Sequence, residues 1–333
     1  MMKQATVQSG KGIDTIAIRE APIPQPGPGE ALIRITAATL NFRDTIVARG
    51  LIPGLGKEPE VVPLSCCAAE VVQVGEGVTR VTAGERVVPI FAPFWLTGST
   101  PDSRMLGGPI DGVARQYAVF AADALCHLPD ELGDLEGATL ACAALTSWSA
   151  LTAFRSTGPG DWVLAHGTGG VSIAALQLAK AMGAKVAITS SSDAKLARAK
   201  SYGADLCINY RRTPDWAGEV RKALGDRPIQ NVVDTVGAVQ FDDNVALLSE
   251  GGQLSAIGML GSDFSWTRLG EAGVTLPPIG VGNRQQHEAM TRFIVEHRIR
   301  PVVDVVYDLD RLQDAYNHLE SGRFFGKVGV SLL

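Results

Sequence analysis

The clearest chemical pattern in this sequence is a run of glycines in the second half of the chain. Gly167, Gly169 and Gly170 lie in the segment 167–172, GTGGVS, between an apolar run expected to be a strand and another expected to be a helix. Gly167 permits a tight turn, and Gly169 lets backbone approach a ligand closely. The N-terminus of the following helix would present free N–H groups to a pyrophosphate. The pattern predicts a dinucleotide-binding turn, although Ser172 replaces the third small residue and a tight strand-to-helix turn alone could use the same glycines.

The residues after the second expected strand bear on which dinucleotide would bind. An acidic residue about 20 positions past the glycines would bond the ribose of NAD, but the chain there reads Ser190-Ser191-Ser192. Lys195 lies one helical turn later, and Tyr210-Arg211-Arg212 follow the next expected strand. Hydroxyl groups and cations suit a phosphate, so NADPH is favoured. The alternative is that Asp193 bonds the ribose, but we expect it to cap the next helix by accepting backbone N–H bonds.

These residues need a parallel sheet to hold them, and the chain after Pro129 predicts one. Helices are expected at 171–182 and 193–202, each ended by a glycine. Their alternation with short apolar strands is typical of a doubly wound parallel sheet. The expected strands are 161–165, 185–189, 206–208, 231–234 and 253–257.

The first third of the chain predicts mostly β structure instead. Residues 31–35 alternate in polarity, 70–74 precede a glycine turn signal, and 86–90 are a further short strand. Proline at alternate positions of 22–29 excludes a helix or a central strand, which leaves an extended loop. Residues 91–113 are expected to form a long loop.

Composition excludes several classes of protein. The 333 residues suggest two domains, and 46% apolar with 20% charged residues is ordinary for a globular chain. A net charge of -5 without a basic stripe argues against a nucleic-acid partner. Five cysteines without a C-x-x-C pair do not suggest a disulfide framework or a zinc lobe, so a reducing cytoplasm fits. The N-terminus has no signal-peptide pattern, and the uncharged run 137–154 favours a buried helix over a membrane span.

Short motifs along essentially the whole chain carry a family resemblance. They are Asn41-Phe42-Arg43-Asp44 with Gly50, Val74-Gly75-Glu76-Gly77-Val78, Gly84-Glu85-Arg86-Val87, Ala144-Leu145-Thr146-Ser147-Trp148, Asp205 to Tyr210, and Glu320 to Arg323 with Gly326-Lys327-Val328. Together with the glycine turn, they resemble the medium-chain dehydrogenase/reductase superfamily, and within it the zinc-free, quinone-oxidoreductase-like branch.

The resemblance implies an α/β fold with a GroES-like, mostly-β catalytic domain and a Rossmann domain with a doubly wound parallel sheet. The catalytic domain would comprise 1–127 and a return segment, 270–333, with the NADP-binding Rossmann domain at 128–269. The resemblance places the active site in the cleft between them. It also implies a homodimer, for which 273–277 is a candidate edge strand, although this run could equally be a simple loop.

The resemblance also implies residue roles. Asn41, Asp44 and Thr146 match positions at the nicotinamide end of the site, Ser190 to Tyr210 includes adenosine-phosphate positions, and 282–284 match a V-G-[SN]-R signature beside the cofactor. Arg43 and Tyr117 are candidate donors, but an ion pair at a helix start and a strand tyrosine are the open alternatives. The candidate catalytic residues are Asn41, Arg43, Asp44 and Tyr117. The candidate cofactor-binding residues are Thr146, Gly167, Thr168, Gly169, Gly170, Val171, Ser190, Ser191, Lys195, Tyr210, Gly258, Gly282, Asn283 and Arg284.

The sequence departs from zinc-dependent relatives, which supply a Cys, a His-Glu pair, and a later Cys or Asp. The corresponding positions here fall within 43–44 and 64–70, and only Cys142 matches a ligand position. One soft ligand cannot make a catalytic zinc site, so we expect no metal. The pair Cys66-Cys67 is either buried at a strand start or a redox-sensitive thiol. Ile46 stands where some quinone reductases have a tyrosine.

The expected chemistry follows from that missing zinc. Hydride transfer to a simple ketone builds an alkoxide, which needs a Lewis acid or a strong proton donor. A quinone or an α,β-unsaturated carbonyl spreads the charge, so ordinary hydrogen bonds suffice. We therefore expect NADPH-dependent reduction of such an acceptor, a small molecule. The alternatives are a zinc-independent alcohol dehydrogenase, a non-catalytic NADPH-binding protein, and an enoyl reductase that serves a synthase.

Overall fold

The structure is a computed structural model that describes residues 1–258, 270–277 and 279–333. It consists of two compact units, the first formed by Met1–Leu145 with Val281–Leu333 and the second by Thr146–Gly280. The unit boundaries lie later in the chain than the predicted junctions at 127/128 and 269/270. The first shift arises because a π-helical turn, η3 (Leu140–Ala144), packs against strands of the first unit.

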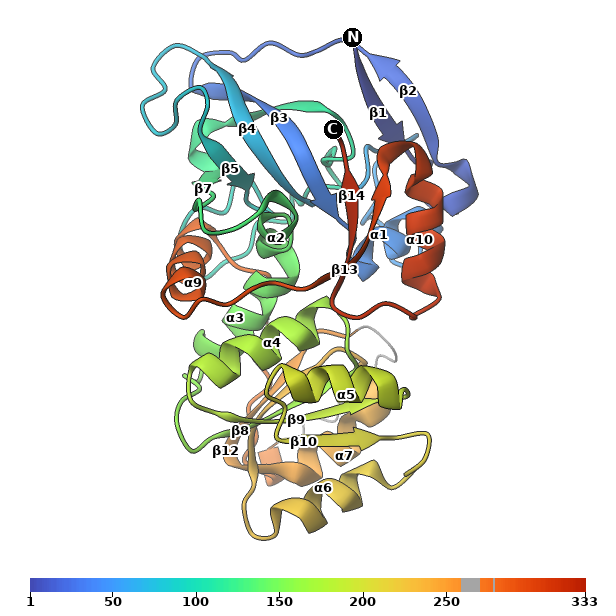
Figure 1. Cartoon of the computed structure of the whole chain (residues 1–333), viewed down its shortest axis with the longest axis vertical. Helices are drawn as coiled ribbons and strands as arrows, with labels where there is room; N and C mark the ends of the chain where they lie inside the picture. The colour runs from blue at the N-terminus through green and yellow to red at the C-terminus, as the bar shows by residue number, and fades with distance from the viewer. Residues whose placement is uncertain (259–269, 278) are drawn as a thin grey trace. The chain divides into compact units, whose positions relative to one another are not determined.

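The first unit is built on a mostly antiparallel sheet (Figure 1), as the alternating segments predict. Its described strands run in the order β13-β14-β3-β4-β5-β7, with β6 paired to β3. The C-terminal segment joins this sheet because β14 pairs antiparallel with β3, at Gly329 opposite Thr39. A separate hairpin is formed by β1 (Met2–Thr6) and β2 (Ala17–Ala21). The sheet strands are β3 (Glu30–Thr39), β4 (Cys66–Val74), β5 (Arg86–Pro89), β6 (Tyr117–Ala121), β7 (Leu125–His127), β13 (Val303–Asp308) and β14 (Lys327–Ser331).

Helices and loops complete the first unit. The segment 22–29 lies outside helices and strands, and 91–113 is a long irregular loop, so both loop predictions are confirmed. Gly50, in the left-handed region at φ 64°, ends the first helix. The helices are α1 (Phe42–Arg49), α2 (Asp134–Gly137), α9 (Arg284–Glu296) and α10 (Leu312–Glu320), with 3-10 turns at Ile13–Thr15, Ala122–Ala124 and Leu309–Arg311.

The described part of the second unit forms a five-stranded parallel sheet in the order β10-β9-β8-β11-β12, as predicted. In Figure 1, α4 and α5 lie on one face of this sheet and α6 and α7 on the other. The strands are β8 (Trp162–His166), β9 (Lys185–Ser190), β10 (Leu206–Asn209), β11 (Ile229–Asp234) and β12 (Leu248–Ala256). The helices are α3 (Leu145–Thr152), which begins at the unit boundary, α4 (Gly170–Ala181), α5 (Asp193–Ser201), α6 (Trp216–Leu224) and α7 (Phe241–Leu247), with a 3-10 turn at Ala238–Gln240.

The strand order determines where a ligand can bind the second unit. Chain progression reverses between β8 and β11, which are neighbours in the sheet. Open α/β sheets bind ligands at the carboxyl ends of the strands that flank such a reversal. A ligand is therefore expected at the turns that follow His166 and Asp234.

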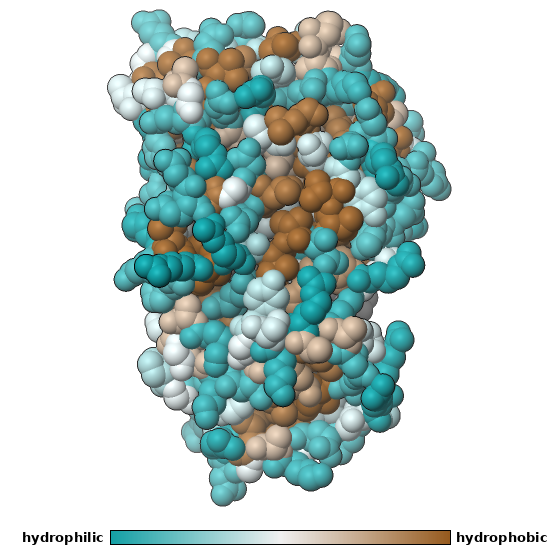
Figure 2. Space-filling view, in the orientation of Figure 1, coloured by the Kyte–Doolittle hydropathy of each residue, from teal (hydrophilic) through white to brown (hydrophobic). Residues whose placement is uncertain are grey.

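Each unit has its own apolar core. In the first unit Ile33, Ile35 and Val328 belong to a buried apolar cluster that also includes residues of α10. In the second unit Leu164 and Val232 belong to a buried cluster that includes residues of α6 and α7. Figure 2 shows a mainly hydrophilic visible face with apolar side chains gathered near the middle of the view. Among the helices that the structure describes, none has the length and apolar character needed to cross a membrane.

Candidate functional site

The glycine turn lies where β8 passes into α4. Gly167 has a φ of 73°, in the left-handed region, and Gly169 is the N-cap residue of α4. A Cβ added at Gly167 would meet no described atom within 4 Å, so the space beside the turn is open. The first N–H groups of α4 lie at this open side of the sheet. The residues therefore fit a pyrophosphate group.

Hydroxyl groups connect the glycine turn to the chain that follows β11 and to α3. Ser172 Oγ donates to the carbonyl oxygen of His166 at 2.5 Å, and Thr235 Oγ1 donates to the same oxygen at 2.7 Å. Ser147 Oγ donates to the carbonyl oxygen of Val171 at 2.8 Å. Ser172, the departure from the glycine pattern, thus fastens α4 to the end of β8, a task that a glycine could not perform.

Sequence reasoning did not anticipate the role of His166. Its imidazole is buried between Thr189 Oγ1, 3.0 Å from Nδ1, and Asn244 Oδ1, 2.7 Å from Nε2. Burial lowers its pKa, although the charge of Asp234 acts in the opposite direction. A neutral imidazole here joins β8, β9 and α7, which is a structural role.

The predicted phosphate-binding residues gather at the end of β9. Ser190 is buried, its hydroxyl accepts a bond from Ser192 N at 3.3 Å, and its carbonyl oxygen accepts one from Tyr210 N at 3.2 Å. Ser191 follows Ser190 directly, and Lys195 lies in the first turn of α5. The structure therefore brings Ser190, Ser191, Lys195 and Tyr210 to one place.

Asp193 has a different role from the predicted one. Ser192 is the N-cap of α5, and its hydroxyl accepts the bond from Lys195 N, so the expectation that Asp193 caps this helix is wrong. Asp193 instead pairs with Arg212 at 2.5 Å and accepts a bond from Asn209 Nδ2 at 2.8 Å. These contacts offset the carboxylate charge at the end of β9. They also engage Arg212, which the sequence offered as a phosphate partner.

Gly258 permits a close approach at the end of β11. A Cβ at Gly258 would lie 2.3 Å from the carbonyl carbon of Val236, so only glycine fits without rearrangement. Asp234 Oδ1 accepts bonds from the N–H groups of Val236 and Gly237, at 2.8 and 3.0 Å. Gly258 therefore belongs to the backbone framework of the predicted nucleotide site. Thr146 is buried where the second unit begins.

In the first unit, the predicted catalytic residue Asn41 lies at the centre of a buried polar cluster. Its Nδ2 donates to Ser65 Oγ at 3.2 Å and to Cys66 Sγ at 3.1 Å. Its Oδ1 accepts a bond from Lys327 Nζ at 2.6 Å, and Lys327 also donates to the carbonyl oxygen of Leu40. Because an ammonium group can only donate, Lys327 determines which way the Asn41 amide faces. The sequence shows Lys327 only within the Gly326-Lys327-Val328 motif, and it does not predict the contact with Asn41 because the two residues are almost a whole chain apart.

Asp44 holds the backbone of Asn41 at the start of α1. Asp44 Oδ2 accepts a bond from the Asn41 N–H at 2.7 Å at the start of α1. Burial raises the pKa of this carboxyl group, although the charge of Arg43 opposes that shift. Arg43 Nη1 lies 3.9 Å from Asp44 Oδ1, so the alternative of an ion pair at the helix start is confirmed. Asp44 thus positions Asn41.

Arg43 of α1 binds the backbone of the long loop 91–113. Its Nη1 and Nη2 donate to the carbonyl oxygens of Leu106 and Gly108 at 2.7 and 2.6 Å. Its guanidinium group also lies over the ring of Phe91, 4.9 Å from the centroid. These contacts tie α1 to the loop 91–113.

The structure does not bring Tyr117 to this cluster. Tyr117 lies on β6 opposite Arg34 of β3, whereas Asn41 follows the end of β3. Seven residues of extended chain separate Arg34 from Asn41, which is about 20 Å. The alternative of a strand tyrosine is confirmed, and its strand pairing, invisible to motif comparison, explains the difference.

Two thiols belong to the Asn41 cluster. Cys66 and Cys142 lie near enough for each thiol to influence the pKa of the other. Burial raises the pKa of the Cys66 thiol, but the nearby Cys142 thiol, the charge of Lys327 and the Asn41 amide together bring it below its usual value. The nearby Cys66 thiol and burial raise the pKa of Cys142. Cys67 is also buried, as expected for both members of the pair, and burial raises its pKa.

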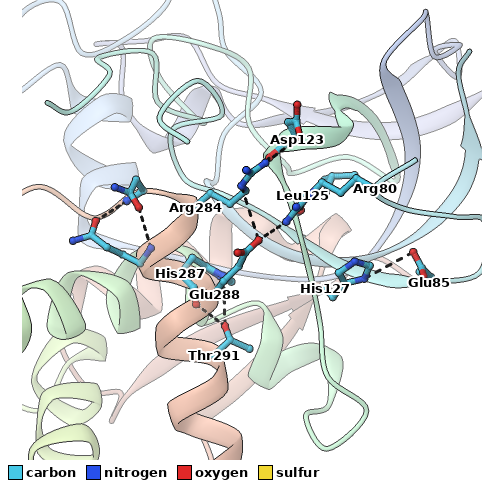
Figure 3. A network of polar contacts seen from close by, with 11 residues as sticks. Arg80, Glu85, Asp123, Leu125, His127, Arg284, His287, Glu288 and Thr291 are labelled. Carbon is cyan, nitrogen blue, oxygen red and sulfur yellow. Dashed lines mark hydrogen bonds and ion pairs between the residues drawn. The ribbon is translucent and has the colours of Figure 1, made fainter. Parts of the chain in front are cut away.

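The predicted signature 282–284 starts helix α9 (Figure 3). Asn283 Oδ1 accepts a bond from Gln286 N at 2.9 Å, and Asn283 Nδ2 donates to the carbonyl oxygen of Gly98 at 2.9 Å. Arg284 Nη1 donates to the carbonyl oxygen and the carboxylate of Asp123, at 2.8 and 3.0 Å. Gly282 has a φ of 145° and lies against Leu145. These bonds give the signature a structural role within the first unit, and its contact with a cofactor stays a prediction.

The comparisons with known proteins identify the family. Residues 27–130 match the alcohol dehydrogenase GroES-like domain, and residues 170–296 match the zinc-binding dehydrogenase model. A zinc-type alcohol dehydrogenase-like protein of Schizosaccharomyces pombe is 38% identical over 96% of both chains. The chain therefore belongs to the medium-chain dehydrogenase/reductase superfamily and is an oxidoreductase of the alcohol dehydrogenase-like kind.

Solved structures extend this likeness. An NAD-dependent alcohol dehydrogenase has 29% identity and a TM-score of 0.88, with 99% of both chains covered. A mycobacterial protein complexed with NADPH has 27% identity and a TM-score of 0.83, with 99% of this chain and 100% of that one covered.

The family name implies zinc, but the donor set does not fit it. Around Asn41 the candidate donors are two thiols, an amide and a hydroxyl, and the Lys327 ammonium group contacts that amide directly. Within residues 1–258, 270–277 and 279–333, no three His, Cys, Asp or Glu side chains are grouped to hold a metal ion. A catalytic zinc site needs three protein ligands, and a neighbouring cation would repel the ion.

Proposed function

We propose that this protein is an NADPH-dependent oxidoreductase that transfers hydride to a quinone or an α,β-unsaturated carbonyl without a metal ion. The observation that carries the proposal is the donor set around Asn41, where Lys327 supplies a positive charge and the thiols and amide do not fit zinc. A conjugated acceptor suits such a site because its developing charge is delocalised and hydrogen bonds can stabilise it.

The second unit contributes the cofactor site in this proposal. Bound NADPH would supply the hydride from its nicotinamide ring. The turn at 167–171 and the N-terminus of α4 would hold the pyrophosphate. Ser190, Ser191, Lys195 and Tyr210 would hold the 2′-phosphate. The engagement of Asp193 by Arg212 and Asn209 supports this choice because it reduces repulsion of that phosphate.

The first unit contributes the groups that orient the acceptor. Asn41 would bind it, and Asp44 would act as a positioning residue through the Asn41 N–H. Lys327 keeps the Asn41 amide facing one way. A proton for the reduced product could come from solvent, because an enolate or phenolate does not require an immediate donor.

A titration of NADPH against NADH tests the cofactor choice. We expect Lys195→Ala to weaken NADPH binding about tenfold or more, because a hydrogen bond to a charged group contributes about 1.5–3 kcal/mol, and to leave NADH binding almost unchanged. Lys200→Ala is the matched control, since Lys200 is an exposed lysine later in α5. Tighter binding of NADH by about tenfold in the unmodified protein would overturn the choice.

A panel of substrates tests the acceptor class. We expect oxidation of NADPH with 1,4-benzoquinone or an enone by protein shown to contain no zinc. Reduction of NADP by alcohols instead would favour the alcohol dehydrogenase alternative, which the names of the relatives support. Cofactor binding without turnover across the whole panel would favour a non-catalytic binding protein.

The proposal includes a homodimer in the cytoplasm. Thr275 forms an isolated bridge to Gln253, which places the 273–277 segment alongside β12. Its backbone bonds to Gly252 and Leu254 are 2.9 and 2.8 Å long. This placement supports an edge that a second copy could extend, and sedimentation of the purified protein tests it.

A further inference from the structure

The turn at 210–213, which follows β10, is fastened to the end of the parallel sheet. Asn209, the last residue of β10, lies opposite Ser190 of β9 in the ladder. Tyr210 N donates to the carbonyl oxygen of Ser190 at 3.2 Å, and Arg212 N donates to the carbonyl oxygen of Asn209 at 3.1 Å. The turn therefore begins beside Ser190, one of the residues that we propose to hold the 2′-phosphate.

The side chain of Asn209 connects this turn to the start of α5. Its Nδ2 donates to Asp193 Oδ1 at 2.8 Å, and its Oδ1 accepts a bond from Arg211 N at 3.0 Å. The other carboxylate oxygen of Asp193, Oδ2, lies 2.5 Å from Arg212 Nη2. Asp193 thus contacts the end of β10 with one oxygen and the turn with the other. We call Asp193, Asn209 and Arg212 together the turn brace.

The turn needs such contacts because it lies on the surface of the second unit. Tyr210, Arg211 and Arg212 are all exposed. Exposed connections with few buried contacts are the most mobile parts of a fold. A ligand that must first order a mobile turn binds more weakly than one that meets a turn already held in place.

We propose that Asp193 is a positioning residue for the 2′-phosphate: through Asn209 and Arg212 it holds the 210–213 turn in its binding conformation before the cofactor arrives. The inference rests on the proposed function and assigns one more residue to its cofactor site. Asp193 acts through its neighbours and does not touch the phosphate. Its charge alone would repel a phosphate, so the brace and simple repulsion predict effects of opposite sign when the carboxylate is removed.

Hydrogen exchange of the full-length, cofactor-free protein tests the brace by itself. We expect Asp193→Ala to speed amide exchange in the peptide that covers 209–213. Asn209→Ala should do the same although it keeps the carboxylate, which separates the brace from a change of charge at the start of α5. Glu219→Ala is the matched control, because Glu219 pairs with Lys222 within α6 and its loss should leave this exchange unchanged. Unchanged exchange in Asp193→Ala would overturn the inference.

Titration of the same proteins with NADPH and NADH tests the link to the cofactor. We expect Asp193→Ala to weaken NADPH binding about fivefold, the upper range for an exposed ion pair, and to change NADH binding much less. Glu219→Ala should bind both cofactors as the unmodified protein does. Equal or tighter NADPH binding in Asp193→Ala would overturn the inference, because repulsion alone would then describe the carboxylate. Faster exchange in Asp193→Ala together with a preference of the unmodified protein for NADH would retain the brace and refute the proposed cofactor choice.

Discussion

The buried histidine of α9 makes a quantitative prediction about acid stability. His287 is fully buried, and its Nδ1 lies 3.5 Å from Thr291 Oγ1, which donates to the carbonyl oxygen of His287 at 2.9 Å (Figure 3). Its Nε2 has no hydrogen-bond partner among the described residues. Burial lowers the pKa of His287 from 6.5 to about 4, although the charge of Glu288 opposes this shift.

The size and sign of the effect follow from proton linkage. The unfolded chain protonates this imidazole near its ordinary pKa of 6.5, whereas the folded chain protonates it near 4. The stabilisation is therefore fully present above pH 6.5 and is lost as the pH falls toward 4. The whole difference corresponds to about 3 kcal/mol of unfolding free energy, of which about 2 kcal/mol is lost by pH 5.

Urea denaturation of His287→Leu and of the unmodified protein, between neutral pH and pH 5, measures this effect. We expect His287→Leu to lose about 2 kcal/mol less unfolding free energy over that range. His287→Gln should show the same reduced slope, which separates the titration from any change in packing. His297→Gln, at the exposed C-cap of the same helix, should keep the original pH dependence. Equal slopes for the unmodified and His287 variants would refute the reasoning.

Two further predictions concern the two candidate sites. Lys327→Met should raise the pKa of Cys66 and slow its alkylation near neutral pH, because the nearby positive charge is removed. The control variant Lys11→Met changes an exposed lysine and should leave the rate of alkylation unchanged. An unchanged pH profile of alkylation in Lys327→Met would contradict the account. Gly258→Ala should lower the unfolding free energy by about 1–3 kcal/mol, because its Cβ would meet Val236 at 2.3 Å. Gly158→Ala, whose Cβ would meet no described atom within 4 Å, should have a much smaller effect in the same denaturant titration.

Local patterns were sufficient to predict the five strands of the second unit and its helices α4 and α5. The parallel strands, α4 and the turn at Gly167 follow from short-range rules, because apolar period, glycine position and helix start are properties of neighbouring residues. The N-cap of α5 shows that such rules cannot always choose between two adjacent residues. Ser192 and Asp193 are both good capping residues, and only the contacts of Asp193 with Arg212 and Asn209 determine which one caps.

The surroundings of Asn41 depend on residues far apart in the sequence, and local rules could not predict them. The sequence by itself predicted the β-rich first unit, the loops at 22–29 and 91–113, and Asn41 as a candidate. Tertiary structure placed Tyr117 about 20 Å from Asn41 along the sheet, and it brought Lys327, Cys66 and Cys142 around the Asn41 amide. These residues lie far apart in the chain, and a buried ammonium group or thiol finds its partners only when strands β14 and β4 and the turn η3 come together.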